Sequence, residues 1–516
     1  MEDTDLVDAV ADILDVDPDA FRAEVEADAE HLKELVTGGI FDNPQALTGL
    51  EYEFYAIANP NTEGPGSLTR VPRRLLEFIR FEKELGLHNA EVSTRPLPVN
   101  SDGLAAQEAE IAAQLRTAQD AVHSEDLRLV SDGMWTIPPM GEDATTYLTD
   151  SVEDHGYRIA TNMSASPRYH AMANADARAR PDMAIDAPHV ALSADTVMPE
   201  SLTTSIQPHY QVPRAVNLPV YFRYALRIAG PLTALGANSP LFPPDLYDEA
   251  PPKEILAEAW HANRIAVFES VMNDTTNDIH KVRFPRDIWQ IEDAIDRLAA
   301  DPVMVPLRTE GTDRFDDTFG TLRRKSGTYW RWVRPVLDGG SRESANARIE
   351  FRPIAAQPTI RDSIAFQAAF VGLMEAMPAL DHPVLNLAWE TAEENFYNAV
   401  HDGIDAHLEW IAGDDSPTHD PTAVYTDLID HAAEGLRMRG LSEEAIGRYL
   451  GPLRRRIRHG LTPASWKLRT ATNYVNAGEC LETAIKETQL EYDRRQEATV
   501  FDGTFIDWIE GDSPLR

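Results

Sequence analysis

Four short segments of this chain alternate apolar residues with charged, hydroxyl or amide residues at every second position. They read GLEYEF from residue 49, AEVSTRP from residue 90, SIQPHYQV from residue 205 and ARIEFRPI from residue 347. In a β-strand, residues two apart point to the same face of the sheet. Each segment therefore predicts a strand with one apolar face for the core and one polar face. Stretches of helical periodicity separate the segments. The pattern as a whole predicts an α+β fold, with one antiparallel sheet, helices on one face and the other face free for a ligand.

The polar faces carry the side chains that could hold a metal ion. If the four strands are neighbours, one surface gathers Glu51, Glu53, Glu91, His209 and Glu350, with Arg348 and Arg352 beside them. Carboxylates that stand side by side repel one another unless a cation lies between them. Oxygen-rich ligand sets suit Mg²⁺ or Mn²⁺, and arginines stabilise a transferring phosphoryl group. We interpret the surface as a site for metal-assisted phosphoryl chemistry, which needs no protein nucleophile.

Each segment alone also has a simpler interpretation. Glu51 and Glu53 could belong to a solvated edge strand, and Arg348, Glu350 and Arg352 could form a surface charge ladder. Pro208 favours an edge strand or a bulge for its own segment. A shared site is favoured because four strands follow one alternation rule with complementary ligand types.

Composition narrows the class of protein. The formal net charge of −38 comes from acidic residues along the whole length, and arginines greatly outnumber lysines. This suits a cytoplasm at molar salt, where charges are screened, so we expect a halophilic protein without a nucleic-acid partner. The single cysteine, Cys480, excludes internal disulfides and zinc sites with several cysteines. No signal peptide is recognisable, and no apolar run approaches the about 20 residues of a membrane span. We expect a soluble cytoplasmic protein without membrane contact.

The pattern along the chain divides it into three parts. These are a helical segment 1–45, a domain 46–400 that holds the candidate site, and a helical region 401–516 packed on that domain. Within the second part, residues 140–200 are expected to be rich in loops. We interpret the basic run LRRRIRHG, at 453–460, as the solvated face of an amphipathic helix paired with nearby acids, rather than as a surface for an anionic partner.

Beyond these patterns, the chain resembles the glutamate–cysteine ligases, which belong to the glutamine synthetase superfamily of carboxylate–amine ligases. GLEYEF resembles the first catalytic strand of that superfamily, AEVSTRP the next metal-binding strand of the ligases, and ARIEFRPIAAQPT the last catalytic strand. Four more stretches are similar to segments of the family, and all occur in the family's order: SPRYHAM, LTTSIQPHYQV, LTALGANSPLF and ENFYNAVHDGIDAHL.

The resemblance implies a fold and a reaction. The sheet would curve into a half-barrel or funnel of the glutamine synthetase catalytic-domain type. ATP and metal ions would enter this funnel from one end, and amino acids from the other. ATP would phosphorylate the γ-carboxylate of glutamate, and an amine would displace phosphate from the acyl phosphate to form an amide and leave ADP. With cysteine as the amine, this is the glutamate–cysteine ligase step of glutathione biosynthesis. The cofactor would be Mg²⁺, with Mn²⁺ as the alternative.

The resemblance also assigns roles to individual residues. The metal ligands would be Glu51, Glu53, Glu91, His209 and Glu350. Arg352, with Arg348 and Arg334, would act with Glu350 at the γ-phosphoryl group. ATP and the other substrates would be bound by Arg352, Gln207, Arg168, Asn238 and Ser239. The stretch Gln207-Pro208-His209 departs from the usual His-Val-His, so that Gln207, His209 or both could be the ligand there.

Other functions stay open at this point. A ligase of the same fold could join a different amine or carboxylate, and a homologue without activity could bind nucleotide alone. Glutamine synthetase shares the first and last catalytic strands, but a β-rich domain precedes them there, whereas the residues before Gly49 have a helical pattern. The sequence carries no signal for the oligomeric state.

Overall fold

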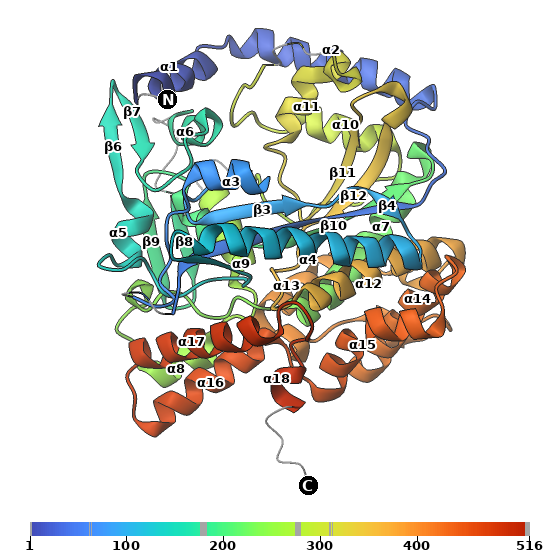
Figure 1. Cartoon of the computed structure of the whole chain (residues 1–516). Helices are drawn as coiled ribbons and strands as arrows, with labels where there is room; N and C mark the ends of the chain where they lie inside the picture. The colour runs from blue at the N-terminus through green and yellow to red at the C-terminus, as the bar shows by residue number, and fades with distance from the viewer. Residues whose placement is uncertain are drawn as a thin grey trace.

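The computed structural model describes residues 3–60, 62, 64–175, 183–273, 280–308, 311 and 313–510. Its centre is an eight-stranded sheet with the order β11-β12-β10-β1-β3-β2, in which β4 and β5 also pair with β1 (Figure 1). Every pairing in this sheet is antiparallel. The predicted α+β fold around one antiparallel sheet is therefore confirmed. The strands are β1 (Leu47–Ala58), β2 (Glu82–Lys83), β3 (Asn89–Ser93), β4 (Leu97–Pro98), β5 (Leu127–Val130), β10 (Ile206–Val212), β11 (Val333–Asp338) and β12 (Asn346–Phe351).

Helices cover the sheet and fill the C-terminal third of the chain. They are α1 (Asp3–Leu14), α2 (Pro18–Thr37), α3 (Arg73–Ile79), α4 (Ser101–His123), α5 (Ala144–Thr149), α6 (Pro167–Asn174), α7 (Leu218–Gly236), α8 (Pro252–Glu258), α9 (Asn263–Met272), α10 (Ile291–Ala300), α11 (Gly320–Ser326), α12 (Ile360–Ala379), α13 (Trp389–Asp402), α14 (Pro421–Met438), α15 (Glu443–His459), α16 (Pro463–Ala477), α17 (Leu481–Thr499) and α18 (Asp507–Glu510). None of the described helices combines the length and apolarity that a membrane span requires.

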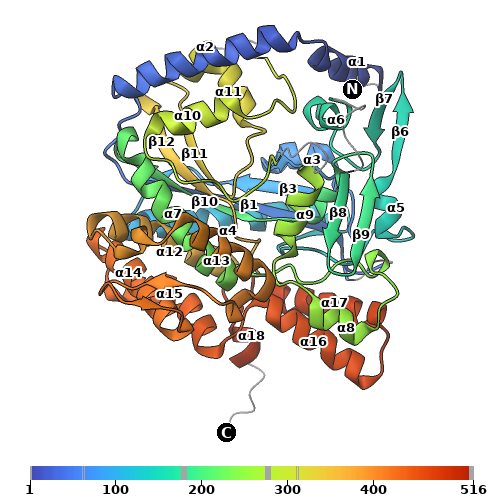
Figure 2. The same ribbon diagram turned by 180° about the vertical axis from the view of Figure 1, so that it is seen from behind.

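The apolar face of the sheet packs on α4, α7 and α12. The ring of Phe351 on β12 stacks on Phe370 of α12, with 4.8 Å between the ring centroids. Tyr52 on β1 is fully buried and donates its hydroxyl to the carbonyl of Gln357 at 2.9 Å. The helices α2, α10 and α11 pack on one another beside β11 and β12 (Figures 1 and 2).

The stretch from 140 to 200 holds more regular structure than expected. It contains α5, α6 and two hairpins, β6 (Ser151–Asp154) with β7 (Tyr157–Ala160) and β8 (Met183–Ala187) with β9 (Val190–Ala194). Each hairpin pairs its own two strands, and they differ in burial. Strands β6 and β7 are mostly exposed or half-buried, whereas β9 alternates buried and exposed residues and β8 packs on α9. A further short hairpin, β13 (Trp410–Ile411) with β14 (Pro417–Thr418), lies between α13 and α14.

Pro208 does not mark an edge strand, because β10 lies between β1 and β12. A proline has no N–H to donate to a neighbouring strand. Opposite Pro208, Leu50 donates its N–H away from β10, to the Thr94 hydroxyl at 2.9 Å. The ladder between β10 and β12 begins one residue later, at His209 and Glu350. Neither neighbouring strand therefore needs a hydrogen bond from position 208.

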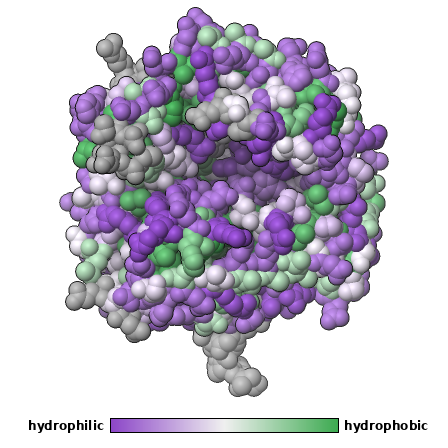
Figure 3. Space-filling view, turned by 45° about the horizontal axis from the view of Figure 1, so that its top comes forward, coloured by the Kyte–Doolittle hydropathy of each residue, from purple (hydrophilic) through white to green (hydrophobic). Residues whose placement is uncertain are grey.

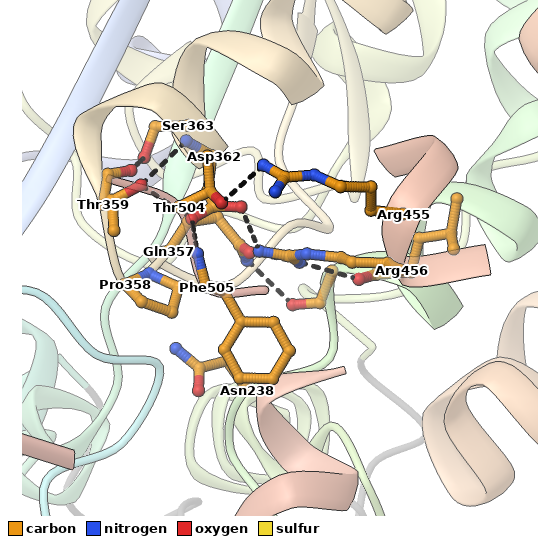
Figure 4. A network of polar contacts seen from close by, with 12 residues as sticks. Asn238, Gln357, Pro358, Thr359, Asp362, Ser363, Arg455, Arg456, Thr504 and Phe505 are labelled. Carbon is orange, nitrogen blue, oxygen red and sulfur yellow. Dashed lines mark hydrogen bonds and ion pairs between the residues drawn. The ribbon is translucent and has the colours of Figure 1, made fainter. Parts of the chain in front are cut away.

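A buried ion pair joins the C-terminal helices to the layer under the sheet. Arg456 on α15 and Asp362 on α12 are both 0% exposed, with 2.8 Å between Nη2 and Oδ1 (Figure 4). Arg456 also donates to Gln357 Oε1 at 2.7 Å, and Asp362 accepts the N–H of Phe505 at 2.7 Å. The prediction of a solvated face for 453–460 is therefore wrong at Arg456, because the buried carboxylate needs a counter-charge. Arg454 does face outward. Whether 1–45, 46–400 and 401–516 are separate domains stays a prediction.

Candidate active site

The sheet register brings the predicted polar residues onto one face. On β1, Glu51 stands opposite Gln207 of β10, and Glu53 stands opposite Glu91 of β3. On β12, Glu350 stands opposite His209 of β10 and also opposite Arg334 of β11. Arg348 pairs with Gln211 in the same ladder. The residues therefore form a continuous surface that runs from arginines at β11 and β12 to carboxylates at β1 and β3.

Glu350 is held between two arginines at the basic end of this surface. Arg334 donates to its Oε2 from Nη2 at 2.6 Å and from Nε at 3.1 Å, and Arg352 donates to its Oε1. Burial alone would raise the pKa of Glu350, but Arg334 and Arg352 hold it well below its usual range. This carboxylate is ionised at any physiological pH and keeps both arginines aligned on the polar face.

His209 and Glu51 occupy the centre of the face. The Nε2 of His209 lies 3.1 Å from Glu51 Oε1, and Arg348 donates from Nε to His209 Nδ1 at 3.3 Å. Arg348 is itself anchored by Asp338, at 2.6 and 2.9 Å. Burial opposes ionisation of Glu51, but the adjacent His209 outweighs this effect and lowers its pKa.

Gln207 links the two halves of the surface. Its Oε1 accepts a hydrogen bond from Arg352 at 2.6 Å, and its Nε2 donates to Glu53 Oε1 at 2.9 Å. Glu53 also accepts the backbone N–H of Ser205 at 2.7 Å and the Ser205 hydroxyl at 3.0 Å. Both amide atoms of Gln207 are thus engaged by protein, which leaves His209 as the better-placed ligand of the two.

The acidic end of the face gathers carboxylates that have no basic partner. Among the described residues, neither Glu53 nor Glu91 forms an ion pair, and Glu91 is buried. Burial, and next the charge of Glu84, raise the pKa of Glu53 to about 7. Burial raises the pKa of Glu91 well above its usual range, and it raises the pKa of Glu200 to about 8. Crowding of this kind favours a bound cation.

Three residues that the sequence did not single out join this end of the site. Glu84 precedes β3, Glu200 lies in a short 3-10 helix at Met198–Leu202, and Arg264 begins α9. Arg264 is only 4% exposed and donates to the carbonyl of Arg352 at 3.0 Å. Burial lowers its pKa to about 10, and Glu53 opposes this shift. These residues come from segments without alternation, so the period-two pattern could not identify them.

Asn238 and Ser239 are not on the polar face. Both are fully buried. Asn238 donates to the carbonyl of Ala356 at 2.7 Å and to the Tyr492 hydroxyl at 3.0 Å. The Ser239 hydroxyl accepts the backbone N–H of Arg264 at 3.0 Å and so fixes the start of α9. Both side chains are engaged in the core, and Ser239 positions the start of the helix that carries Arg264. A contact of Asn238 or Ser239 with substrate stays a prediction.

Arg168 lies on α6, outside the sheet but toward the acidic end. Its guanidinium carbon lies 4.8 Å from the centre of the Tyr169 ring. Its Nη1 lies beside Gly327, 3.4 Å from the position that a Cβ on that glycine would take. Burial raises the pKa of Tyr169, and Glu84 adds to the increase. Arg168 is therefore close to the carboxylate cluster, without a direct contact to the sheet residues.

A cavity of about 550 Å³ opens at the N-terminal end of β1. Glu51, His209 and Arg348 form part of its wall, whereas Glu53 and Glu91 do not. Figure 3 shows the molecule hollowed in this view, with a hydrophilic floor between the upper and lower halves. The site thus has two unlike ends, a cavity beside Glu51 and an acidic cluster beyond Glu53.

The donor set of the face fits a hard divalent cation. Carboxylate oxygens and one imidazole converge there, and His209 Nε2 is buried without a hydrogen-bond partner although Glu51 is near. In this arrangement Arg348 donates to Nδ1, so the neutral ring carries its proton on Nε2. Binding a metal through Nε2 would move that proton to Nδ1 and displace Arg348 from it. Among the described residues Glu53 and Glu91 form no ion pair, although the charge of Arg264 acts on Glu53, so they need no such change.

A second group of potential ligands, formed by His382, Asp427 and His431, lies away from the sheet. The backbone N–H of Val384 donates to His382 Nδ1 at 3.1 Å, so His382 carries its proton on Nε2 and donates it to Asp427 at 3.0 Å. Trp410 donates to the same carboxylate at 2.7 Å. These hydrogen bonds satisfy the group without a metal ion.

Comparison with known proteins gave one family and several distant structures. The model of the Glutamate-cysteine ligase family 2 (GCS2) matches residues 47–487. No curated protein matches the chain. Among solved structures, a glutamate–cysteine ligase from Francisella tularensis in complex with AMP is 13% identical, with 89% of this chain and 91% of that chain covered and a TM-score of 0.45.

Two further structures are similarly remote. A bifunctional glutathione synthetase from Pasteurella multocida is 12% identical, with 90% of this chain and 54% of that chain covered and a TM-score of 0.44. The ligase PafA, in complex with the prokaryotic ubiquitin-like protein Pup, is 11% identical, with 86% and 72% covered and a TM-score of 0.37. These likenesses are too distant to bear on the fold or the activity of this chain.

Proposed function

The chain belongs to the glutamate–cysteine ligase family 2, a family of carboxylate–amine ligases, and from this premise we propose that it is an ATP-dependent glutamate–cysteine ligase. The observation that carries the proposal is the sheet register. It sets Glu53 opposite Glu91 and sets Glu350 between His209 and Arg334 on a single polar face. Candidate cation ligands and phosphate-binding arginines thus share one surface, which is what transfer of a phosphoryl group requires.

The metal ligands in this proposal are Glu51, Glu53, Glu91, His209 and Glu350. Bound Mg²⁺, or Mn²⁺ in its place, would neutralise part of the phosphate charge of ATP. Glu350 is already shared by Arg334 and Arg352, so its contribution would come through lone pairs that these arginines leave free. Glu53 and Glu91 would contribute most, because they have no other cationic partner among the described residues.

The cavity beside Glu51 is the proposed ATP end of the site. Arg348 lines it, and Arg352 and Arg334 lie just beyond, toward the centre of the face. Their guanidinium groups would bind the oxygens of the γ-phosphoryl group during transfer. Glu350 positions both Arg334 and Arg352, so the three residues act as one unit.

The acidic end is the proposed amino-acid end. Arg264 and Arg168 are the cations there that a substrate carboxylate would meet, with Arg264 buried and Arg168 half-buried.

The proposed reaction has two steps. An oxygen of the γ-carboxylate of glutamate attacks the γ-phosphorus of ATP, and ADP leaves. The amine nitrogen then attacks the acyl carbon, loses a proton and releases phosphate, which leaves an amide. Water must be excluded from the acyl phosphate, and the end of α11 lies against this face, where Arg334 donates to the Ser326 carbonyl at 2.9 Å.

The test is an ADP-release assay with Mg²⁺, ATP and glutamate, in which amines are screened with and without cysteine. We expect ADP release to require both amino acids and to form γ-glutamylcysteine. ADP release with a different amine would support a same-fold ligase of other specificity. Unchanged turnover in both Glu53→Gln and Glu91→Gln would overturn the assignment of the site.

A further inference from the structure

A cavity lined by arginines lies on the opposite side of β11 from the candidate active site. Its volume is about 470 Å³, and Arg283, Arg286, Arg297 and Arg331 all contribute to its wall. Val333 and Pro335 of β11 also line it. Between them, Arg334 points the other way, to Glu350. The cavity and the active site therefore share a strand but open on different faces of it.

The cavity concentrates positive charge in a very acidic protein. The whole chain has a formal net charge of −38, yet the acids in this wall are only Asp301 and Glu393. Asp301 is already shared, since it pairs with Arg331 at 2.7 Å and also with Lys281. The positive charge around the cavity is thus incompletely neutralised by protein groups.

Among the described residues, two of the guanidinium groups have no protein acceptor. In the part of the chain that the structure describes, neither Arg283 nor Arg286 donates a side-chain hydrogen bond, and both are exposed. Arg286 stacks over Trp389 at 4.0 Å. Arg297 donates to the carbonyls of Arg286 and Asp287, each at 2.7 Å, which fixes this loop, and its charge is partly balanced by Asp293 on the same helix. Burial lowers the pKa of Arg283, and the nearby Arg331 lowers it further.

The walls indicate a small ligand rather than a macromolecule. Trp389, Tyr329 and Phe284 are buried and supply aromatic surface around the arginines. The volume falls in the range of about 300–1,000 Å³ that is usual for small-molecule sites. Planar guanidinium groups bind phosphate and carboxylate through paired hydrogen bonds, which a halide ion cannot reproduce.

We propose that this cavity is a second ligand site of the protein, separate from the active site, and that it binds a small multivalent oxyanion through Arg283 and Arg286. The ligand carries at least two phosphate or carboxylate groups. One of them meets Arg283 and Arg286 at the mouth, and another lies toward Arg331.

The test is calorimetric titration of the metal-free full chain with pyrophosphate and, separately, with citrate. The first probe represents phosphate ligands and the second represents carboxylate ligands. We expect at least one probe to bind the wild type and to bind the Arg283→Ser/Arg286→Ser variant at least about tenfold more weakly. The surface variant Arg22→Ser is the matched control and should bind as the wild type does.

A second variant distinguishes binding in this cavity from binding in the active site. Arg352→Gln should retain the binding, because Arg352 lies on the other face of the sheet. The proposal is overturned if neither probe binds, if sulfate binds as tightly as both probes, or if Arg352→Gln loses the binding while the double variant keeps it. If the double variant does not fold, Arg283→Ser alone replaces it. No turnover is measured, so the result is independent of the proposed ligase activity.

Discussion

Glu53 and Glu91 stand directly opposite each other on β1 and β3, and neither is paired with a basic residue among the described ones. Two such carboxylates destabilise the metal-free protein through repulsion and poor solvation. We expect Glu91→Gln to raise the unfolding temperature in EDTA by about 2 °C and to abolish the further stabilisation by Mg²⁺. Differential scanning fluorimetry with and without Mg²⁺ checks both effects. A variant that keeps the full Mg²⁺ response would contradict the role of Glu91 in metal binding.

Arg352 joins Glu350 to Gln207 and so connects the two halves of the site. If it stabilises the transferring phosphoryl group, Arg352→Gln should lower kcat by about 10²- to 10³-fold, with a smaller change in the KM for glutamate. The exposed Arg22→Gln is the control, since Arg22 forms only an ion pair with Asp19 at 3.0 Å. Steady-state kinetics measure both constants. An increase in KM with an unchanged kcat would assign Arg352 to substrate binding alone.

Arg456 and Asp362 form an ion pair without access to solvent. Removal of one partner leaves a buried charge unpaired, so Arg456→Met should lower the free energy of unfolding by about 3–5 kcal/mol. The same change at Arg454, which lies 4.0 Å from Asp430 and is 40% exposed, should cost less than about 1 kcal/mol. Urea titrations of both variants test this contrast. The double variant Arg456→Met/Asp362→Asn should regain part of the loss, because no unpaired charge then remains.

Glu269 gives the stability a pH dependence that is independent of the active site. Burial raises its pKa to about 7, although Trp332 and Tyr397 donate to it at 2.6 and 3.0 Å. A raised pKa in the folded state favours folding below the unfolded pKa of about 4.3, and this contribution disappears as the pH rises through about 7. The full difference is about 4 kcal/mol. Glu269→Gln mimics the neutral form and should therefore gain in unfolding temperature over the wild type as the pH rises across this interval. A constant difference would show that Glu269 is ionised throughout.

The net charge of −38 predicts a response to salt. Repulsion among acidic groups weakens when salt screens them, so the unfolding temperature should rise steadily from dilute to molar KCl. Thermal unfolding at a series of KCl concentrations measures this. A flat profile would argue against adaptation of the protein to molar salt.

The alternation of residues predicted which side chains share a face, because the period of a strand is a local property. Glu51 and Glu53, Gln207 and His209, and Arg348 and Glu350 all lie as expected. The alternation could not predict the register, that is, which residues of neighbouring strands stand opposite each other. That Glu350 falls between His209 and Arg334 depends on which strands pair, and the pairing of β10 with β12 joins residues more than 100 positions apart.

The remaining differences also have physical causes. Arg264 and Glu200 reach the site from segments whose position is set by tertiary packing, as shown by the Ser239 hydroxyl that holds the start of α9. Pro208 was compatible with an interior strand only because its neighbours direct their hydrogen bonds elsewhere. Arg456 has the residue type of a surface position, and its burial follows from a carboxylate on a distant helix.

Strand β11 carries Arg334 toward one surface and Val333 and Pro335 toward another. A shift of one residue in a strand turns every side chain to the opposite face. Insertion or deletion of a single residue within β11 would therefore damage both surfaces together, even if each substituted residue were acceptable by itself. Across related chains we expect the length of this strand to vary less than its composition.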